Sequence, residues 1–243
     1  MMQATIMKRR GQLAEMADGH DSPELRHLFL EGRERRFPAG EHLITEGEAT
    51  DYVYDLLDGT IALARNGRDG RRQILSFMGA GQFLGAASTR NYPNLATALT
   101  DVVAISYPRA ALERALDTTP GFASEFRRVL TRILEAAHDH VYTVGQRSAL
   151  ERTASFILFL RANQARFSPD GPREKSVHIA LPMTRLDIAD FLGLKIETVS
   201  RSFSALKRMG VISFKDSHAC TIENLDRIRV LGGREDFTQH RGA

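Results

Sequence analysis

Residues 184–212 read TRLDIADFLGLKIETVSRSFSALKRMGVI, a pattern that predicts two short helices joined by a tight turn. Thr184 can accept a hydrogen bond from the backbone three residues further on, where Asp187 completes a capping-box-like start for the first helix. The residues expected on the buried face of that helix are Leu186, Ile188, Ala189 and Leu192. The stretch therefore opens with an amphipathic helix whose beginning is marked in the sequence.

The turn after this helix has the residue spacing of a helix-turn-helix. Ala189 is small where two helices must cross, Gly193 tolerates the positive φ of a tight turn, and Val199 is a branched core residue in the second helix. A lone glycine would predict only a turn. The three residue types together predict a helix-turn-helix, which is a motif that commonly binds DNA.

The second helix, expected at about 196–209, separates an apolar side from a polar one. Its inward residues step by four and three and are Val199, Phe203 and Leu206. Glu197, Ser200 and Arg201 then share the other side. Arginine can donate to guanine O6 and N7, glutamate can accept from cytosine N4, and serine permits close approach to a thymine methyl. The alternative is a solvated helix with an ordinary Glu–Arg pair four residues apart.

Basic and hydroxyl residues border this face and could hold DNA phosphates. They are Thr184, Arg185, Lys195, Thr198, Lys207 and Lys215. Beyond the second helix, VISF (211–214), KDSHA (215–219) and CTIE (220–223) predict a hairpin, which makes the module a winged helix-turn-helix. Cys220 falls in one of the two strands, and we expect it to be a small packing residue.

Upstream, residues 35–108 show a pattern of short strands separated by turns. Apolar runs such as YVYDLL (52–57) and TIALA (60–64) have strand length and are bounded by glycine. Turn signals recur roughly every 8–12 residues, which is typical of an all-β sandwich or barrel. The clearest hairpin turn is NGRDG (66–70), because Asn-Gly and Asp-Gly favour tight turns.

After Pro108 the pattern becomes helical, with a short helix at 109–116 and a long one from Pro120. One apolar line on the long helix, at steps of four and three, comprises Phe122, Phe126, Val129, Ile133, Ala136 and His140. A second line beside it comprises Leu130, Leu134 and Val141. One line can face the barrel while the other faces a partner helix, so we expect a dimerisation helix. The alternative is a helix that packs only on its own barrel.

The long helix is expected to give way to an interdomain hinge at 145–148, GQRS. A further amphipathic helix is expected at 150–164. Its inward residues are Ala154, Ile157, Leu158 and Leu160. We expect His140, near the end of the long helix, to be a packing or specificity residue rather than a ligand.

Composition excludes several classes of protein. The chain has 243 residues, a net charge of +3 and a single cysteine, so it fits two modest domains and cannot form a disulfide framework. No apolar run approaches the ~20 residues that cross a bilayer. Residues 1–22 lack the apolar core of a signal peptide, so we expect a cytoplasmic protein with no membrane partner.

An enzyme of the metal-dependent jelly-roll type would need a His-x-His pair and a carboxylate on the barrel, but residues 35–108 contain only His42. On a helix, His138 and His140 point about 200° apart and cannot chelate one ion. The sequence therefore predicts neither an enzyme nor a metal site.

Two motifs resemble the CRP/FNR transcription regulators, and the resemblance covers about residues 30–230. The segment FPAGEHLITEGEATDYVYDLLDGTIAL (37–63) looks like the family's effector-domain opening, with Gly40, Gly47 and Gly59 at the expected turns. The segment 184–212 is similar to the family's DNA-binding helices, and its E-x-x-S-R core is that of the FNR and FixK branch.

The resemblance implies an α+β chain with an N-terminal jelly-roll β-barrel of the cyclic-nucleotide-binding type, a long dimerisation helix and a C-terminal winged helix-turn-helix. We therefore divide the chain into an arm (1–24), an effector-type barrel (25–118), a dimerisation helix (119–145), a DNA-binding domain (146–232) and a tail (233–243). A two-fold dimer suits a palindromic operator in double-stranded DNA.

In the FNR and FixK branch, the residues matching Glu197, Ser200 and Arg201 read a TTGA-type half-site, usually within TTGAT-N4-ATCAA. Ile196 stands where cyclic-AMP-type members carry a base-contacting arginine, which favours the same preference and places Ile196 in the base-reading set. The resemblance also implies RNA polymerase as a partner, with the loop 67–72 as a candidate contact.

The resemblance also bears on cofactors, and we expect none. The cyclic-nucleotide members use a Gly-Glu pair and an Arg-Ser/Thr pair for the phosphate, but here Gly85-Ala86 and about Asn94-Leu95 stand in their place. The N-terminal cysteine cluster that holds an iron–sulfur cluster in FNR proteins is missing as well. This leaves a FixK-like regulator that needs no bound small molecule. The alternative is a sensor of the same family gated by haem, nitric oxide or a small metabolite in the barrel, since haem could need only one axial histidine.

Overall fold

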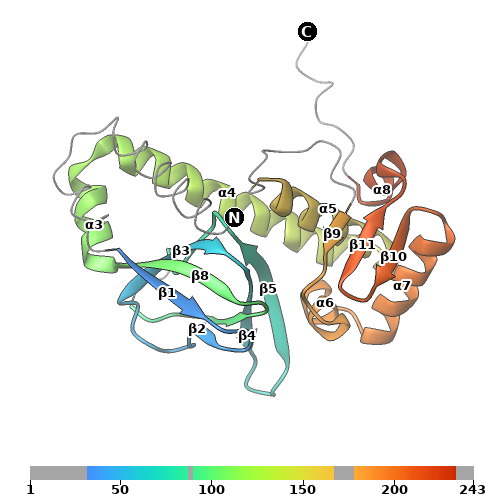
Figure 1. The fold of residues 1–243 in the computed structure, drawn as a ribbon, viewed down its shortest axis with the longest axis horizontal. Coiled ribbons are helices and arrows are strands. Elements are labelled where there is room, and N and C mark those ends of the chain that lie inside the picture. The colour runs from blue at the N-terminus through green and yellow to red at the C-terminus, as the bar shows by residue number, and fades with distance from the viewer. Residues whose placement is uncertain (1–31, 87–89, 167–177, 234–243) are drawn as a thin grey trace, which may run out of the picture. The chain divides into compact units, whose positions relative to one another are not determined.

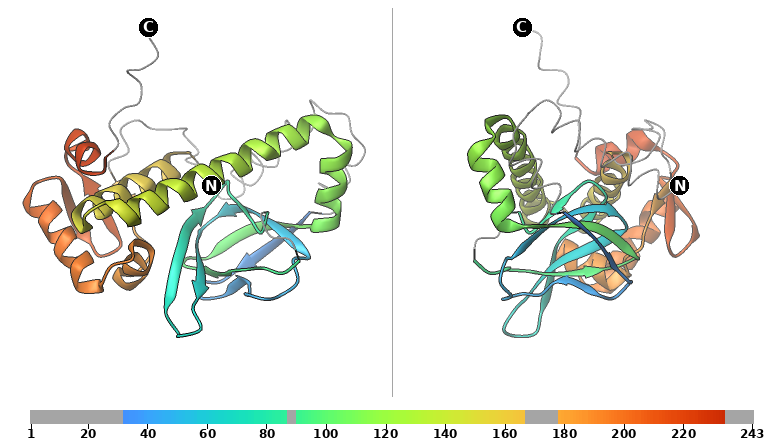
Figure 2. Two further views of the ribbon diagram at one scale, coloured as in Figure 1. Left: turned by 180° about the vertical axis from the view of Figure 1, so that it is seen from behind. Right: turned by 60° about the vertical axis from the view of Figure 1, so that its left-hand side comes forward.

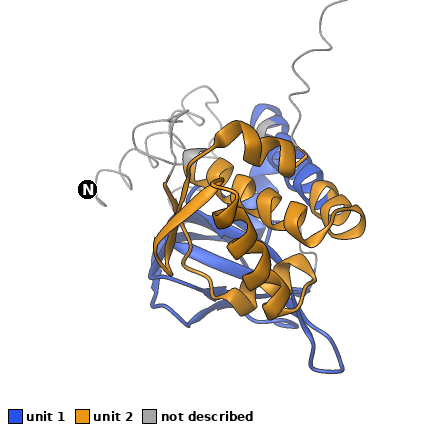
Figure 3. Ribbon diagram, turned by 90° about the vertical axis from the view of Figure 1, so that its right-hand side faces the viewer, with its two compact units in different colours: residues 1–137 blue, residues 138–243 orange. Residues whose placement is uncertain are grey.

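The computed structural model of the protein describes residues 32–86, 90–166 and 178–233. The chain forms two compact units, 1–137 and 138–243, and the boundary between them falls inside the long helix α4 (Pro120–Gln146). Figure 3 distinguishes the two units by colour. The predicted N-terminal arm and, apart from Gly233, the predicted tail lie outside the described residues.

The first unit is a β-barrel of two four-stranded antiparallel sheets (Figures 1 and 2). One sheet has the order β1 (Arg33–Phe37), β8 (Val102–Pro108), β3 (Tyr52–Asp58) and β6 (Phe83–Leu84). The other has the order β2 (His42–Ile44), β7 (Leu95–Ala98), β4 (Thr60–Asn66) and β5 (Arg72–Gly79). Strands distant in the sequence are neighbours in each sheet, which is the arrangement of a jelly roll. The predicted barrel is confirmed.

Strand β8 shows why parts of the barrel read as unbroken apolar runs. Val102 and Ala104 lie in the core between the two sheets. Val103, Ile105 and Tyr107, which point the other way, pack against helix α3 (Arg109–Thr118) and the start of α4. Both faces of the strand are buried, so apolar residues occupy consecutive positions instead of alternating ones.

The turn predicted at 66–70 is confirmed. Strands β4 and β5 pair from Thr60 with Gly79 to Asn66 with Arg72, and the Gly70 N–H donates to the Gly67 carbonyl at 3.0 Å. The glycines predicted to lie at turns, Gly40, Gly47 and Gly59, have the positive φ values that tight turns require.

The second unit contains a winged helix-turn-helix. Its elements after α4 are α5 (Ala149–Arg166), β9 (His178–Ala180), α6 (Arg185–Leu192), α7 (Ile196–Arg208), β10 (Ile212–Asp216), β11 (Ala219–Ile222) and α8 (Leu225–Leu231). The predicted hairpin forms two strands of a sheet with the order β10-β11-β9. The four residues predicted to face inward on α5 are buried. Strand β9 and helix α8 were not predicted.

The hinge prediction is wrong at its first two residues. Helix α4 continues through Gly145 and Gln146, and only Arg147 and Ser148 separate it from α5. Gly145 is exposed, and its cost of about 1 kcal/mol relative to alanine is not enough to end a helix of 27 residues. None of the helices in the described part of the chain is long and apolar enough to cross a membrane.

Candidate nucleic-acid interface

Helix α6 begins with the predicted capping box. The Thr184 hydroxyl accepts from the Asp187 N–H at 3.1 Å, and Asp187 Oδ2 accepts from the Thr184 N–H at 2.9 Å. The same carboxylate oxygen accepts the Thr184 hydroxyl proton at 2.6 Å. Asp187 is buried, so these bonds replace the water that its carboxylate loses on folding. The start of α6 is thus closed by its own side chains.

The turn of the motif also has the predicted form. Gly193 ends α6 in the left-handed conformation, with φ +62, and its N–H donates to the Ala189 carbonyl. The Leu194 N–H donates to the same carbonyl at 3.0 Å. A side chain at Gly193 would be strained by this φ and would press on Val144, 3.3 Å from its Cβ position. Glycine at this position allows α7 to begin three residues later.

One residue of the first helix is placed differently from its prediction. Leu186 is 52% exposed, whereas Ile188 and Leu192 are fully buried. A step of two residues from Ile188 rotates the side chain by about 200° around the helix, which puts Leu186 on the outer side. Phe191, one step of three from Ile188, takes a buried place instead.

Helix α7 presents the predicted base-reading side chains to solvent. Its apolar residues Val199, Phe203 and Leu206 are buried. The residues on its other side are exposed and are Ile196, Glu197, Ser200 and Arg201. Within residues 32–86, 90–166 and 178–233, the side chains of Glu197, Ser200 and Arg201 form no hydrogen bond or ion pair. The Glu–Arg pair of the alternative interpretation is therefore absent from this part of the structure.

Arg185 lies on an aromatic platform. Its guanidinium carbon is 3.9 Å from the ring centre of Phe203 on α7 and 5.3 Å from that of Phe214 on β10. Burial lowers the pKa of Arg185 from its usual value, and in the described part of the chain no carboxylate pairs with it. Stacking occupies the flat faces of a guanidinium and leaves its N–H edge available to an anion.

The other predicted phosphate ligands differ in their availability. Thr184 is used by the capping box, and Thr198 is half-buried. Lys195, Lys207 and Lys215 are exposed. Lys195 is the N-cap of α7 and makes no side-chain capping bond, and within the first turn the Thr198 N–H donates to the Lys195 carbonyl at 3.0 Å.

The predicted dimer-helix residues divide into three groups. Phe122 and Phe126 are buried in the barrel unit's own core, where Leu130 also packs. His140 stacks on Phe191 of α6, with ring centres 4.2 Å apart. Ile133 is 41% exposed, Ala136 is exposed and Val129 is half-buried. The seam is therefore limited to the middle of the predicted line, and its dimer contact stays a prediction.

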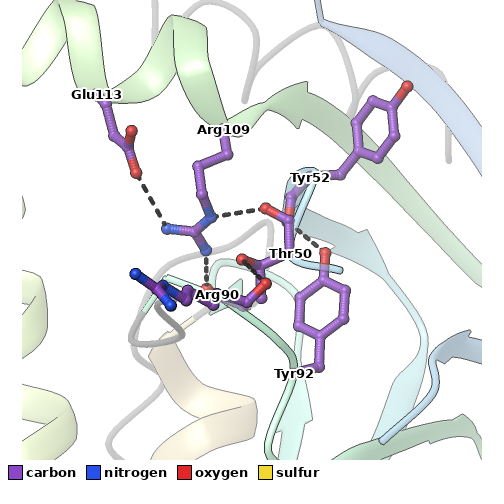
Figure 4. Close-up of polar contacts among 7 residues, drawn as sticks. Thr50, Tyr52, Arg90, Tyr92, Arg109 and Glu113 are labelled. Carbon is purple, nitrogen blue, oxygen red and sulfur yellow. Dashed lines mark hydrogen bonds and ion pairs between the residues drawn. The ribbon is translucent and has the colours of Figure 1, made fainter. Parts of the chain in front are cut away.

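Arg109 bridges the barrel corner around Gly85, which corresponds to the phosphate-binding segment of the cyclic-nucleotide members (Figure 4). Arg109 Nε donates to the Thr50 carbonyl at 2.8 Å, and an Nη donates to the Gly85 carbonyl at 2.6 Å. The other Nη lies 3.7 Å from Glu113. All of these contacts are internal to the chain.

Tyr92 fills the space beside Gly85. Its hydroxyl donates to the Tyr52 carbonyl at 2.5 Å, and burial raises the pKa of Tyr92 to about 12. Gly85 has φ +84, and a Cβ at this position would lie 3.1 Å from the Tyr92 ring. Residues 87–89, the middle of this segment, lie outside the described residues. The described residues also contain no group of three or more His, Cys, Asp or Glu side chains that could hold a metal ion.

The sequence did not reveal two features of the site. Phe203 was assigned to the core, but nothing in its spacing showed that it also carries Arg185. Arg152 on α5 was not singled out, yet it donates to the Leu192 carbonyl at the end of α6. The two partners are 40 residues apart in the chain, so no local pattern could show the bond.

A barrel, a long helix and a winged helix-turn-helix with an exposed polar reading face define a class of proteins, the DNA-binding transcription regulators. Known families match both halves of the chain: the cyclic nucleotide-binding domain matches residues 34–119, and the Crp-like helix-turn-helix domain matches residues 151–231.

Curated relatives and a solved structure support the same class of protein. The nitrogen fixation regulation protein FixK of Bradyrhizobium diazoefficiens is 36% identical over 79% of this chain and 79% of its own length. The transcriptional activatory protein AadR of Rhodopseudomonas palustris is 38% identical over 73% and 72%. The structure of FixK2 from Bradyrhizobium japonicum superimposes with a TM-score of 0.75 at 30% identity, covering 82% of this chain and 96% of that one. The chain belongs to the CRP/FNR family of transcription regulators, with FixK proteins as close neighbours.

Proposed function

We propose that this protein is a homodimeric transcription activator that reads TTGA-type inverted repeats with Glu197, Ser200 and Arg201. The observation that carries the proposal is the exposed, internally unpaired state of these three side chains, among the described residues, on the outer face of α7. A reading helix must keep its donors and acceptors free for base edges, and each good bidentate base contact is worth about 1–3 kcal/mol of discrimination.

The chemistry of the trio fits the G·C pair of a TTGA half-site. Arg201 can donate to guanine O6 and N7, and Glu197 can accept from N4 of the paired cytosine. Ser200 lies between them on the helix and is small enough for a thymine methyl to approach. AadR is described as a transcriptional activatory protein, which supports activation as the mode of regulation.

Phosphate contacts around this face would orient the helix in the major groove. Arg185 offers a guanidinium that is already fixed on Phe203, so little side-chain entropy is lost when its N–H edge meets a phosphate. The uncapped N-terminus of α7 and Lys195 offer a second position for an anion. Lys207 and Lys215 would add weaker, sequence-independent attraction.

A two-fold dimer would present two reading helices to the two halves of a palindrome. Apolar side chains on α4 support this assembly, because Ile133, Leu134, Val141 and Tyr142 are all more than two-fifths exposed. An exposed apolar face of this kind is typical of a helix that pairs with another copy. The hairpin loop at 67–72 is exposed, and we propose it as a contact for RNA polymerase.

We propose that the dimer binds DNA without a cyclic nucleotide or an iron–sulfur cluster. Arg109 directs its donors to two carbonyl oxygens of the chain, and Tyr92 occupies the space beside Gly85. The match to a cyclic nucleotide-binding domain supports one second candidate, a sensor gated by haem, nitric oxide or a metabolite in the barrel. An absorption spectrum of purified protein with and without added haem tests the haem form of this candidate, since bound haem gives an intense visible band.

The test is a mobility-shift titration at one fixed salt concentration, using TTGAT-N4-ATCAA and a scrambled duplex of equal composition. We expect the palindrome to bind at least about a thousandfold more tightly, as is usual for specific over non-specific sites. Equal affinity for the two duplexes would refute the proposal. Sedimentation of the free protein and of the complex measures the stoichiometry of two chains per duplex.

A further inference from the structure

We propose that Arg152 is a positioning residue that, with the His140–Phe191 stack, locks the helix-turn-helix to the last two turns of α4. By doing so it sets the spacing of half-sites that the dimer accepts. The inference rests on the proposed function and deepens it, because spacing has meaning only for a dimer that reads an inverted repeat.

Arg152 bridges two backbone positions that belong to different elements. Its Nε donates to the Arg147 carbonyl at 2.8 Å, one residue beyond the end of α4. Its Nη1 donates to the Leu192 carbonyl at 3.0 Å, in the last residue of α6. Both bonds are partly buried and charge-assisted, which makes them stronger than ordinary hydrogen bonds. One rigid guanidinium thus holds the junction after α4 and the turn of the motif at a fixed separation.

Packing contacts connect the same parts of the second unit. The rings of His140 and Phe191 stack with centres 4.2 Å apart and an angle of 21° between their planes. Phe156 and Phe159 of α5 contact the same Phe191 ring, each at 5.6 Å. Val144 lies against Gly193, where a side chain would not fit without displacement. Helix α4 therefore meets both the buried side of α6 and its C-terminal turn.

The position of the reading helix depends on these contacts. Helix α7 follows α6 after only three residues, and its buried residues pack on the same unit. The α4 segment from 138 onward belongs to the DNA-binding unit rather than to the barrel unit. In contrast, each residue of the stretch 131–139 is exposed. The contacts of Arg152, His140 and Val144 at the end of α4 therefore fix the direction of α7 relative to that end of α4.

The experiment measures affinity by fluorescence anisotropy for TTGAT and ATCAA half-sites separated by three, four, five or six base pairs. A duplex with a single half-site is included. The variants are Arg152→Met, which keeps the apolar stem and removes both donors, and the milder Arg152→Lys, whose ammonium cannot reproduce the two-pronged bond. His140→Ala removes the stack, and His140→Phe preserves it.

Arg147 supplies a matched control at the same junction. Its guanidinium bonds Ser155 and the Gly232 carbonyl, so it fastens α8 instead of the turn of the motif. Arg147→Lys should lower the melting temperature without altering the spacing preference. The carbonyl of residue 147 that Arg152 uses remains in this variant.

We expect the wild type to prefer four base pairs sharply. Arg152→Met and His140→Ala should bind the duplex with this spacing roughly tenfold more weakly, which is the size of effect expected from losing about one charge-assisted bond or one aromatic contact. Their affinity for duplexes with the other spacings should change little. Their affinity for the single half-site should stay within about twofold, and His140→Phe should match the wild type. Arg152→Lys should fall between the wild type and Arg152→Met.

A uniform loss of affinity at every spacing and at the single half-site would show that Arg152 serves only the stability of the domain, and would overturn the inference. Variants that keep the sharp spacing preference of the wild type would overturn it as well. A wild type that does not distinguish the palindrome from a scrambled duplex would instead overturn the proposed function, and this inference with it. Melting temperatures measured for every variant identify any that fails to fold, in which case Arg152→Lys decides.

Discussion

Arg109 in the barrel and Arg201 on the reading helix are the same residue type in opposite situations. The Arg109 side chain is 14% exposed, and its guanidinium donates to two carbonyl oxygens of its own chain. Arg201 is exposed and has no such bond within the described residues. An arginine whose donors are satisfied internally stabilises a fold, whereas one held ready on a rigid helix is free to bind another molecule. The difference supports our proposals that the protein's specificity lies in α7 and that Arg109 serves the stability of the barrel.

Replacing Arg201 should give the largest effect. Arg201→Ala removes the bidentate donor to guanine, so the palindrome should lose about 1–3 kcal/mol of discrimination per half-site against the scrambled duplex. Anisotropy titrations of both duplexes at one salt concentration measure this. Lys207→Ala is the control, and it should weaken both duplexes by a similar factor because a phosphate contact carries no sequence information.

Replacing Arg109 should affect stability instead of recognition. Arg109→Met leaves the Thr50 and Gly85 carbonyls without their donor, which should cost about 2–3 kcal/mol in the free energy of unfolding. Urea denaturation measures the loss. The ratio of affinities for the palindrome and the scrambled duplex should remain that of the wild type. A variant of full stability would show that the corner is solvated and able to accept a ligand, and the comparison would then fail.

Adding cyclic AMP tests whether the same barrel corner can bind this ligand. A ligand present at about a hundred times its Kd raises the free energy of unfolding by about 2.7 kcal/mol. We expect no change in the melting temperature of the wild type at millimolar cyclic AMP. A rise of several degrees would contradict the structural role given to Arg109 and Tyr92.

Replacing Arg185 should give a smaller effect, visible in the salt dependence of binding. Arg185→Gln removes one proposed phosphate contact per half-site, so the slope of log K against log salt should become shallower by about one per half-site. The preference between palindrome and scrambled duplex should persist. An unchanged slope would mean that the guanidinium on Phe203 only joins α6, α7 and the wing.

The smallest expected effect is a pH dependence at the end of α4. Burial lowers the pKa of His140 below its usual value of about 6.5. The unfolded chain therefore takes up a proton at a higher pH than the folded chain, and stability present above about pH 6.5 is lost as the pH falls below it. Thermal melts at about pH 8 and about pH 5.5 should show this loss. His140→Phe should show a smaller one, because the stack remains and the titrating group is gone.

The sequence predicted those features that local rules determine. The capping box at Thr184, the turn at Gly193 and the buried face of α7 each depend on residues within a few positions of one another. A β-sandwich or barrel was equally accessible, because short apolar runs bounded by glycine are typical of such folds, whereas the jelly roll itself followed only from the family resemblance. The motif alone also located the exposed trio on α7.

Features that depend on long-range packing could not be read in this way. Leu186 looked apolar enough for the core, but an eight-residue helix offers too few positions to fix which side is inward. Phe122 and Phe126 fit a dimer seam by spacing, and only the folded barrel shows that they complete its own core. Arg152 and Arg185 act through partners on other elements, so their roles follow from tertiary structure rather than from pattern.

The most direct test of the central claim is a cycle of four affinities between Arg201 and the guanine of the half-site. Wild type and Arg201→Ala are titrated against TTGAT-N4-ATCAA and against the duplex in which the G·C pair of both half-sites is replaced by A·T. If Arg201 reads guanine, the base change should cost the wild type about tenfold or more per half-site and should cost the variant almost nothing. A variant that still distinguishes the two duplexes as sharply as the wild type would contradict the account.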